Sequence, residues 1–124
     1  MLVTGIAFTA YPVTDLKRAR RFYEETLGLQ SSMVFGDEKT AWVEYNIGPG
    51  TLAISNFMPE WKPSPGGGSV GLELADFDAA IQRLKQEGVR ILNGPLDTPV
   101  CRLAVIADPD GNSITLHHCK TGGG

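Results

Sequence analysis

The sequence has no long apolar run, few cysteines and no excess of positive charge. No stretch approaches the ~20 apolar residues of a membrane span, so we expect no membrane partner. The net charge is −3 and the pI is near 5.3, so the chain has no excess of positive charge to attract the phosphate backbone of a nucleic acid. We therefore expect no nucleic-acid partner. The N-terminus lacks a signal-peptide layout and there are only two cysteines, which favours free thiols and a cytoplasmic location.

Glycine and proline are abundant instead, with 15 and 8 residues in a chain of 124. They predict many tight turns and short connections rather than a long helical bundle. The length suits one globular domain with a core of its own. The basic cluster KRARR lies on a predicted helix, where we expect it to form a solvated face.

The chain contains two copies of a β-α-β-β-β pattern. In the first copy, a strand in GIAFTAYPV and a helix in VTDLKRARRFYEETLGL precede strands in SSMVFG, TAWVEYNIG and TLAISNF. The segment MPEWKPSPGGGS is rich in proline and glycine and is predicted to be a linker. In the second copy, SVGLEL and the helix ADFDAAIQRLKQEGV precede strands in RILNGPL, VCRLAVIAD and NSITLHHC. The turn DPDG between the last two strands is predicted to form a hairpin rather than a phosphate loop.

Equivalent landmarks recur at nearly constant spacing. Thr14 or Asp15 is expected to cap the first helix and Asp76 the second, and Asp15 and Asp76 are 61 residues apart. Glycine ends both helices, at Gly28 and Gly88, which are 60 residues apart. This offset indicates an internal duplication. We therefore expect one domain over residues 1–124, with module one at about 1–57, a linker at 58–68 and module two at about 69–120.

The segments VTDLKRARRFYEETLGL, ADFDAAIQRLKQEGV and RLAVIADPDGNSITL, in this module order, resemble the vicinal oxygen chelate superfamily. That superfamily includes glyoxalase, bleomycin-resistance proteins and extradiol dioxygenases. The resemblance covers nearly the whole chain and implies an α+β fold. In it, two βαβββ modules form a curved mixed sheet around a cleft, with the helices on the convex side. It also implies a homodimer. Because the superfamily hosts several activities as well as binders, function has to be argued from the site.

The resemblance also implies where metal ligands would stand. Members with metal chemistry carry His or Gln on the first strand of each module and Glu on the last. Here the first-strand positions hold Phe8 and Ser69, and the last-strand positions hold Ala53 and Thr115. These side chains cannot replace imidazole and carboxylate, and a divalent first-row ion needs about three or four N, O or S donors. We therefore predict no metal at the inherited positions and no cofactor.

Three other side chains on the predicted cleft face carry useful chemistry. His117 titrates near neutral pH and is a candidate general base or hydrogen-bond donor. Glu73 is a candidate proton carrier, unless it pairs with an arginine such as Arg102. Cys101 is either a reactive thiol or a small buried hydrophobe, and the sequence favours the latter because no neighbouring cation is evident. His118 follows His117 on the strand, so the two rings face opposite ways and cannot chelate together.

Aromatic residues suggest a wall for a planar or apolar ligand, formed by Phe8, Trp42, Phe57 and Trp61. Glu44, two residues after Trp42, is a further candidate on the same face. The predicted catalytic residues are therefore His117 and Glu73, and the predicted ligand contacts are Phe8, Trp42, Glu44, Ser69, Cys101 and Thr115.

Three functions follow from these residues. The first is binding of a small organic molecule in the cleft, as in the bleomycin-resistance branch. The second is a metal-independent lyase or isomerase that acts on a small organic acid or aldehyde through His117 or Glu73. The third is a metal-dependent lyase or dioxygenase with ligands displaced to His117, Glu73 and Glu44, with Cys101 as a possible fourth. The missing inherited ligands favour the first.

Overall fold

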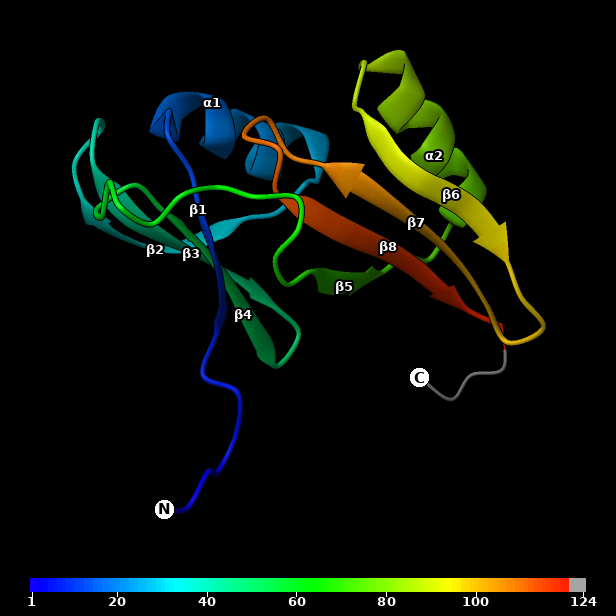
Figure 1. The fold of residues 1–124 in the computed structure, drawn as a ribbon, viewed down its shortest axis with the longest axis horizontal. Coiled ribbons are helices and arrows are strands. Elements are labelled where there is room, and N and C mark those ends of the chain that lie inside the picture. Colours follow the sequence, from blue (N-terminus) through cyan, green and yellow to red (C-terminus); the bar gives the residue numbers. More distant parts are fainter. Residues whose placement is uncertain (121–124) are drawn as a thin grey trace. The chain divides into compact units, whose positions relative to one another are not determined.

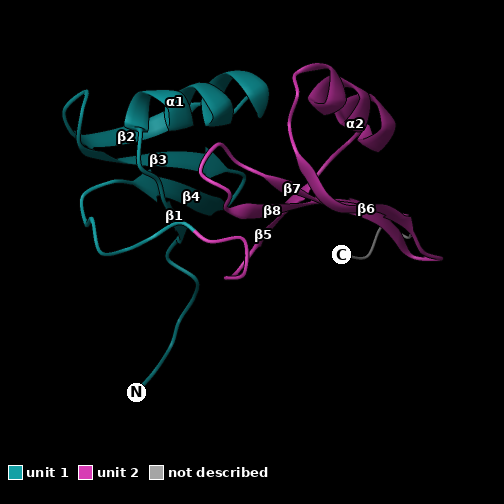
Figure 2. Ribbon diagram, turned by 45° about the horizontal axis from the view of Figure 1, so that its top comes forward, with its two compact units in different colours: residues 1–63 teal, residues 64–124 magenta. Residues whose placement is uncertain are grey.

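The computed structural model describes residues 1–120, which form two compact units divided between residues 63 and 64 (Figure 2). Both units have the predicted β-α-β-β-β order, and the α+β class is confirmed (Figure 1). The division lies within the segment that the sequence marks as a linker. The arrangement of both modules as one domain stays a prediction.

The first unit is a four-stranded mixed sheet with the strand order β1-β4-β3-β2. Strand β1 runs parallel to β4, whereas the other neighbours are antiparallel. The first strand is shorter than predicted, and residues 1–8 precede it with exposed side chains. The elements of this unit are β1 (Thr9–Pro12), α1 (Leu16–Arg21), η1 (Phe22–Thr26), β2 (Ser31–Gly36), β3 (Ala41–Ile47) and β4 (Gly50–Ser55).

The second unit repeats this topology with the order β5-β8-β7-β6, in which β5 and β8 are parallel. A parallel pair needs a crossover connection, and the helix provides its first part in both units. The elements are β5 (Val70–Glu73), α2 (Phe77–Gln86), β6 (Ile91–Asp97), β7 (Cys101–Ala107) and β8 (Ser113–Cys119).

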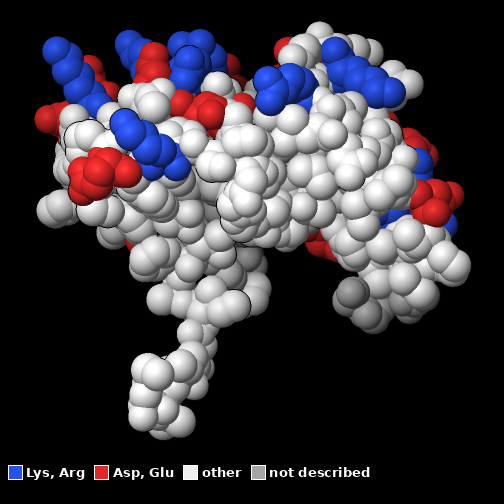
Figure 3. Space-filling view, viewed as in Figure 1, with Lys and Arg blue, Asp and Glu red and all other residues white. Residues whose placement is uncertain are grey.

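The helix of each unit covers one face of the sheet in that unit. The charged side chains visible in Figure 3 gather largely over α1 and α2, on the solvent side of these helices. In KRARR, Lys17, Arg18 and Arg21 are exposed, which confirms the expected solvated face. The buried residues are Leu16, Ala19, Phe22, Tyr23, Val43, Tyr45, Leu52 and Ile54 in the first unit and Phe77, Ile81, Leu84, Ala104, Ile106, Ile114 and Leu116 in the second.

The two helices differ by one residue between cap and stop. The carboxylates of Asp15 and Asp76 accept the third backbone N–H of their helices, at 3.1 Å in both cases. Gly28 and Gly88 end them with φ of 73° and 75°. The first helix changes from α to π geometry over η1, and this wider turn accommodates its extra residue. The sequence did not predict the change of geometry.

The DPDGN segment forms the predicted hairpin between β7 and β8. The Asp108 carboxylate accepts the backbone N–H groups of Asp110 and Asn112, both at 2.9 Å, and Gly111 has a φ of 88°. These local bonds confirm its structural role. Across residues 1–120, no helix has both the length and the apolarity that crossing a membrane requires.

The second cap offers a test of helix stability. Asp76→Ala is expected to lower the free energy of unfolding by about 1 kcal/mol, because the N–H of Ala79 loses its acceptor. Asp76→Asn keeps a side-chain oxygen at the same place and is expected to remain close to wild type. Chemical denaturation measures both variants. Equal stability of Asp76→Ala and wild type would show that this cap contributes nothing.

Candidate functional site

The sheet face opposite the helix carries the candidate residues of the second unit. The strand register aligns Glu73 on β5 with His117 on β8, and His117 with Leu103 on β7. Cross-strand partners share a face and side chains alternate along each strand. Thr115 and Cys101 therefore project from the same face as Glu73 and His117.

Glu73 and His117 form a close ion pair. Nδ1 of His117 donates to Oε1 of Glu73 at 2.5 Å, and the backbone N–H of Cys119 donates to Oε2 at 2.7 Å. Both oxygens of the carboxylate are thus held in place. Because the carboxylate can only accept, the ring proton of His117 resides on Nδ1.

The pair shifts the pKa of both partners. The hydrogen bond from His117, followed by that from the Cys119 backbone, lowers the pKa of Glu73 below its ordinary 4.5. The hydrogen bond to Glu73 raises the pKa of His117 above its ordinary 6.5; partial desolvation opposes this shift, and a hydrogen bond with the Cys101 side chain adds to it. The geometry therefore favours the charged imidazolium–carboxylate pair.

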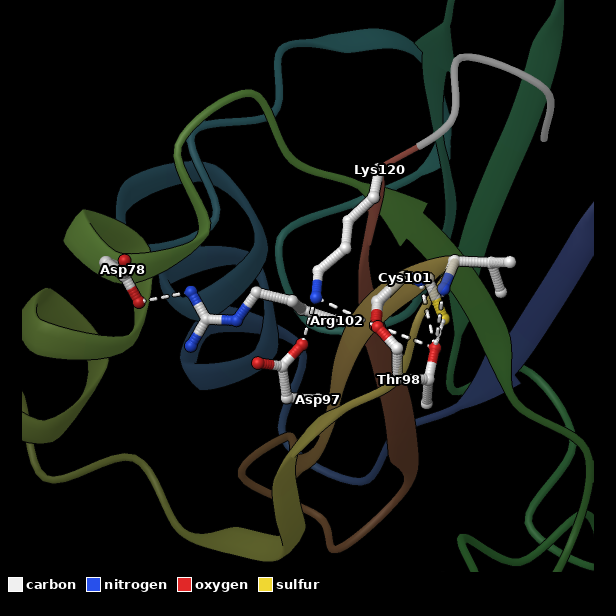
Figure 4. A network of polar contacts seen from close by, with 7 residues as sticks. Asp78, Asp97, Thr98, Cys101, Arg102 and Lys120 are labelled. Atoms are coloured by element: carbon white, nitrogen blue, oxygen red, sulfur yellow. Dashed lines mark hydrogen bonds and ion pairs between the residues drawn. The ribbon is translucent and has the colours of Figure 1, made fainter.

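Arg102 is not the partner of Glu73. The register places Arg102 opposite His118, on the face toward α2. Its guanidinium donates to Asp78 at 2.5 Å (Figure 4). The guanidinium carbon also lies 4.7 Å from the centre of the Phe77 ring. The predicted alternative was wrong because one residue along a strand changes the face. His118 also lies on this face, and its Nδ1 is 2.7 Å from the backbone oxygen of Leu74.

Cys101 has neighbours that the sequence did not reveal. Its side chain is only partly buried, and neither Cys101 nor Cys119 is in a disulfide. The strand register places Cys101 opposite Cys119, so it is a diagonal neighbour of His117 on the same face, which the sequence alone did not reveal. The Thr98 hydroxyl lies 3.4 Å from its sulfur and accepts its backbone N–H at 2.9 Å (Figure 4). Thr98 was missed, although its place three residues before Cys101 suits a turn.

Ser69 and Thr115 hold the two metal-ligand positions that the resemblance assigns to the second module. Their hydroxyl oxygens lie 2.8 Å apart and share a hydrogen bond. The two hydroxyl groups thus hydrogen-bond to each other, and neither carries a charge. In the part of the chain that the structure describes, no group of three or more His, Cys, Asp and Glu side chains is arranged to hold a metal ion.

The first unit brings Phe8, Trp42 and Glu44 together. The rings of Phe8 and Trp42 meet edge to face with centres 5.0 Å apart, and the Trp42 indole N–H donates to the Glu44 carboxylate at 2.8 Å. Phe8 is 46% exposed, so this aromatic cluster has a free surface. Ala53, at a position where the resemblance would place a metal ligand, is completely buried.

Phe57 and Trp61 do not join this aromatic cluster. Phe57 packs against Phe35, with ring centres 6.0 Å apart. Trp61 lines a separate pocket of about 320 Å³ in the first unit, together with Val13, Thr14, Asn56, Met58, Pro59, Lys62 and Pro63. The sequence placed Trp61 in the aromatic wall and did not predict this pocket.

With this geometry established, comparison with known proteins defines the family. Residues 5–116 match the model of the Glyoxalase/Bleomycin resistance protein/Dioxygenase superfamily, and the chain belongs to it.

Several individual proteins are similar to the chain over most of their length. TnmS3, an antibiotic-binding protein from Streptomyces sp. CB03234, is 29% identical with a TM-score of 0.78, over 97% of this chain and 99% of that one. A glyoxalase/bleomycin resistance protein from the same organism is 32% identical with a TM-score of 0.72, over 90% and 98%. Virulence protein STM3117 from Salmonella typhimurium is 27% identical, over 94% and 85%.

The ion pair of the second unit predicts the titration of His117. An NMR titration of the two histidines should give His117 a pKa above 6.5, and Glu73→Gln should lower it, because the main stabilisation of the imidazolium is removed. Glu44→Gln is the control and should leave this pKa unchanged. A His117 pKa that Glu73→Gln does not alter would contradict the ion pair.

The same pair sets a pH window for stability. Because folding raises the pKa of His117, this residue adds to the free energy of unfolding. Its contribution is complete below pH 6.5 and is lost as the pH rises through the pKa of the folded protein. Because folding lowers the pKa of Glu73, this residue also adds to the free energy of unfolding. Its contribution is complete above pH 4.5 and is lost as the pH falls through the pKa of the folded protein. The stability difference between wild type and His117→Gln should therefore be greatest between these two values.

Proposed function

We propose that the chain binds a small organic molecule on the open sheet faces, without a metal at the inherited positions. The observation that carries the proposal is the Phe8–Trp42 pair, in which Phe8 is exposed, Trp42 is partly buried and the indole is fixed by Glu44. Aromatic surface with a few fixed polar groups is typical of small-molecule sites. The likeness to TnmS3, an antibiotic-binding protein, supports the same function.

The replacement of all four inherited ligands supports the metal-independent part of the proposal. Phe8 contributes an apolar ring, Ala53 is buried, and Ser69 and Thr115 bond one another. Two neutral hydroxyls, whose neighbours Glu73 and His117 are already paired with each other, make a poor site for a divalent first-row ion.

A second copy of the chain is part of the proposal. The N-terminal segment exposes Leu2, Val3 and Ile6 by 87%, 77% and 88%. Apolar side chains exposed so close together are typical of interaction sites. We propose a cytoplasmic homodimer in which both modules form one domain of this family.

A metal-independent lyase or isomerase is the second candidate function. The observation that favours it is the 2.5 Å contact between Glu73 and His117. A carboxylate that orients an imidazole is a recurrent arrangement for proton transfer, and a small organic acid or aldehyde is the substrate class.

The binding proposal predicts that Trp42 is a main contact of the ligand. Calorimetry with aromatic antibiotics, including bleomycin, should yield a compound whose Kd rises about tenfold or more in Trp42→Leu, because the aromatic contact is lost. Phe57→Leu is the control, since Phe57 packs elsewhere. Excess EDTA should leave the Kd unchanged.

The outcomes of this experiment separate the candidate functions. A Kd unaffected by Trp42→Leu would overturn the proposed site, and one sensitive to EDTA would overturn the metal-independent part. A compound recovered chemically unchanged supports binding. Conversion that disappears in His117→Gln would support the enzyme instead.

The proposed homodimer predicts a light-scattering mass near twice the 13.3 kDa of one chain. Replacing Leu2, Val3 and Ile6 with serine should shift this mass toward a single chain if the exposed segment forms the interface. A wild-type mass of one chain over the accessible concentration range would contradict the dimer.

A further inference from the structure

We propose that Cys101 is a reactive thiol that adds to electrophilic carbon, with His117 as its general base and Glu73 as the residue that positions His117. This inference does not depend on binding at the aromatic cluster of Phe8 and Trp42. All three side chains belong to the second unit and project from one face of its sheet.

The hydrogen bonds assign a role to each group. Nδ1 of His117 donates to Glu73 at 2.5 Å, so in the neutral ring, above the pKa of His117, Nε2 is the nitrogen that can accept a proton. Cys101 stands opposite Cys119, two residues along β8 from His117, so its side chain is a diagonal neighbour of the same imidazole on one face of the sheet. Cysteine nucleophiles are activated by this spatial arrangement, in which an imidazole next to the thiol is oriented by a carboxylate.

The turn before Cys101 holds the thiol in place. The Thr98 hydroxyl donates to the Cys101 carbonyl at 2.9 Å and accepts the N–H of Val100 at 3.3 Å. The ammonium group of Lys120 donates to the Thr98 carbonyl at 2.9 Å and also binds the Asp97 carboxylate (Figure 4). Val100 is 57% exposed and Cys101 is only partly buried, so a small reagent can approach the turn.

The reaction that this arrangement supports is conjugate addition to an α,β-unsaturated carbonyl compound. As the bond forms between the sulfur and the β-carbon, the thiol proton passes to Nε2 of His117. The electron pair of the carbon–carbon double bond moves toward the carbonyl oxygen to give an enolate. The imidazolium then returns the proton to the α-carbon. No group is oxidised or reduced, and no further reactant is needed.

Cys119 serves as the control thiol within the molecule. It stands opposite Cys101 in the strand register and is likewise partly buried. Cleavage after Arg90, Arg102 and Lys120 by trypsin places the two cysteines in different peptides. Mass spectrometry can therefore follow both thiols in one sample.

The test is the labelling rate of reduced protein with limiting N-ethylmaleimide. At neutral pH, Cys101 should react about tenfold or more faster than Cys119, and His117→Gln should abolish this difference. Glu73→Gln should shift the inflection of the Cys101 rate profile to lower pH, because Glu73 raises the pKa of His117. A merely structural role of Glu73 would not produce this shift.

Two variants keep the result interpretable. His118→Gln alters the opposite face and should leave the Cys101 rate unchanged, and circular dichroism checks that each variant is folded. Cys119→Ser excludes a disulfide between the two thiols as the cause of a slow reaction. Equal rates of Cys101 and Cys119 in folded wild type, or a fast Cys101 in folded His117→Gln, would overturn the proposal while leaving the binding proposal intact.

Discussion

Each unit has a single helix for a four-stranded sheet, so the helix of a unit covers only one face of its sheet. This constraint determines the rest of the structure. The apolar residues at alternate strand positions, such as Ile114 and Leu116, have to face the helix because burial there removes them from water. The residues between them, Thr115 and His117, are consequently placed on the opposite face. The core thus fixes the orientation of the candidate site without using any of its side chains.

Strand register is accordingly as important as residue type. Glu73 meets His117 because the parallel pairing of β5 with β8 aligns them, and the same register carries Arg102 and His118 to the helix side. A shift of one residue would exchange the two sets. The buried carboxylate of Asp108, bonded to the DPDGN backbone, sets the turn between β7 and β8 and hence where His117 stands relative to Cys101.

Sequence patterns predicted the features that depend on local rules. Caps, glycine stops, the order of elements along the chain and the alternation around His117 are decided within a few residues, and the family resemblance supplied the topology. The only sequence signal of the π turn is that the helix caps of the two modules are 61 residues apart and their glycine stops 60. The neighbourhood of Cys101 and His117 and the pairing of Arg102 with Asp78 depend on how strands pair with one another. The alternation of residues within one strand does not determine that pairing.

The substitutions at the inherited ligand positions change the electrostatics of the open face in the second unit. A divalent cation is a concentrated positive charge and requires anionic donors around it. Ser69 and Thr115 provide none, and the nearby Glu73 already has a partner in His117. The charge that compensates Glu73 is therefore a proton on the imidazole of His117, whose pKa the pair raises. In the functions proposed above, the Thr115 hydroxyl two residues from His117 therefore suits chemistry that moves protons rather than chemistry that polarises a substrate on a metal.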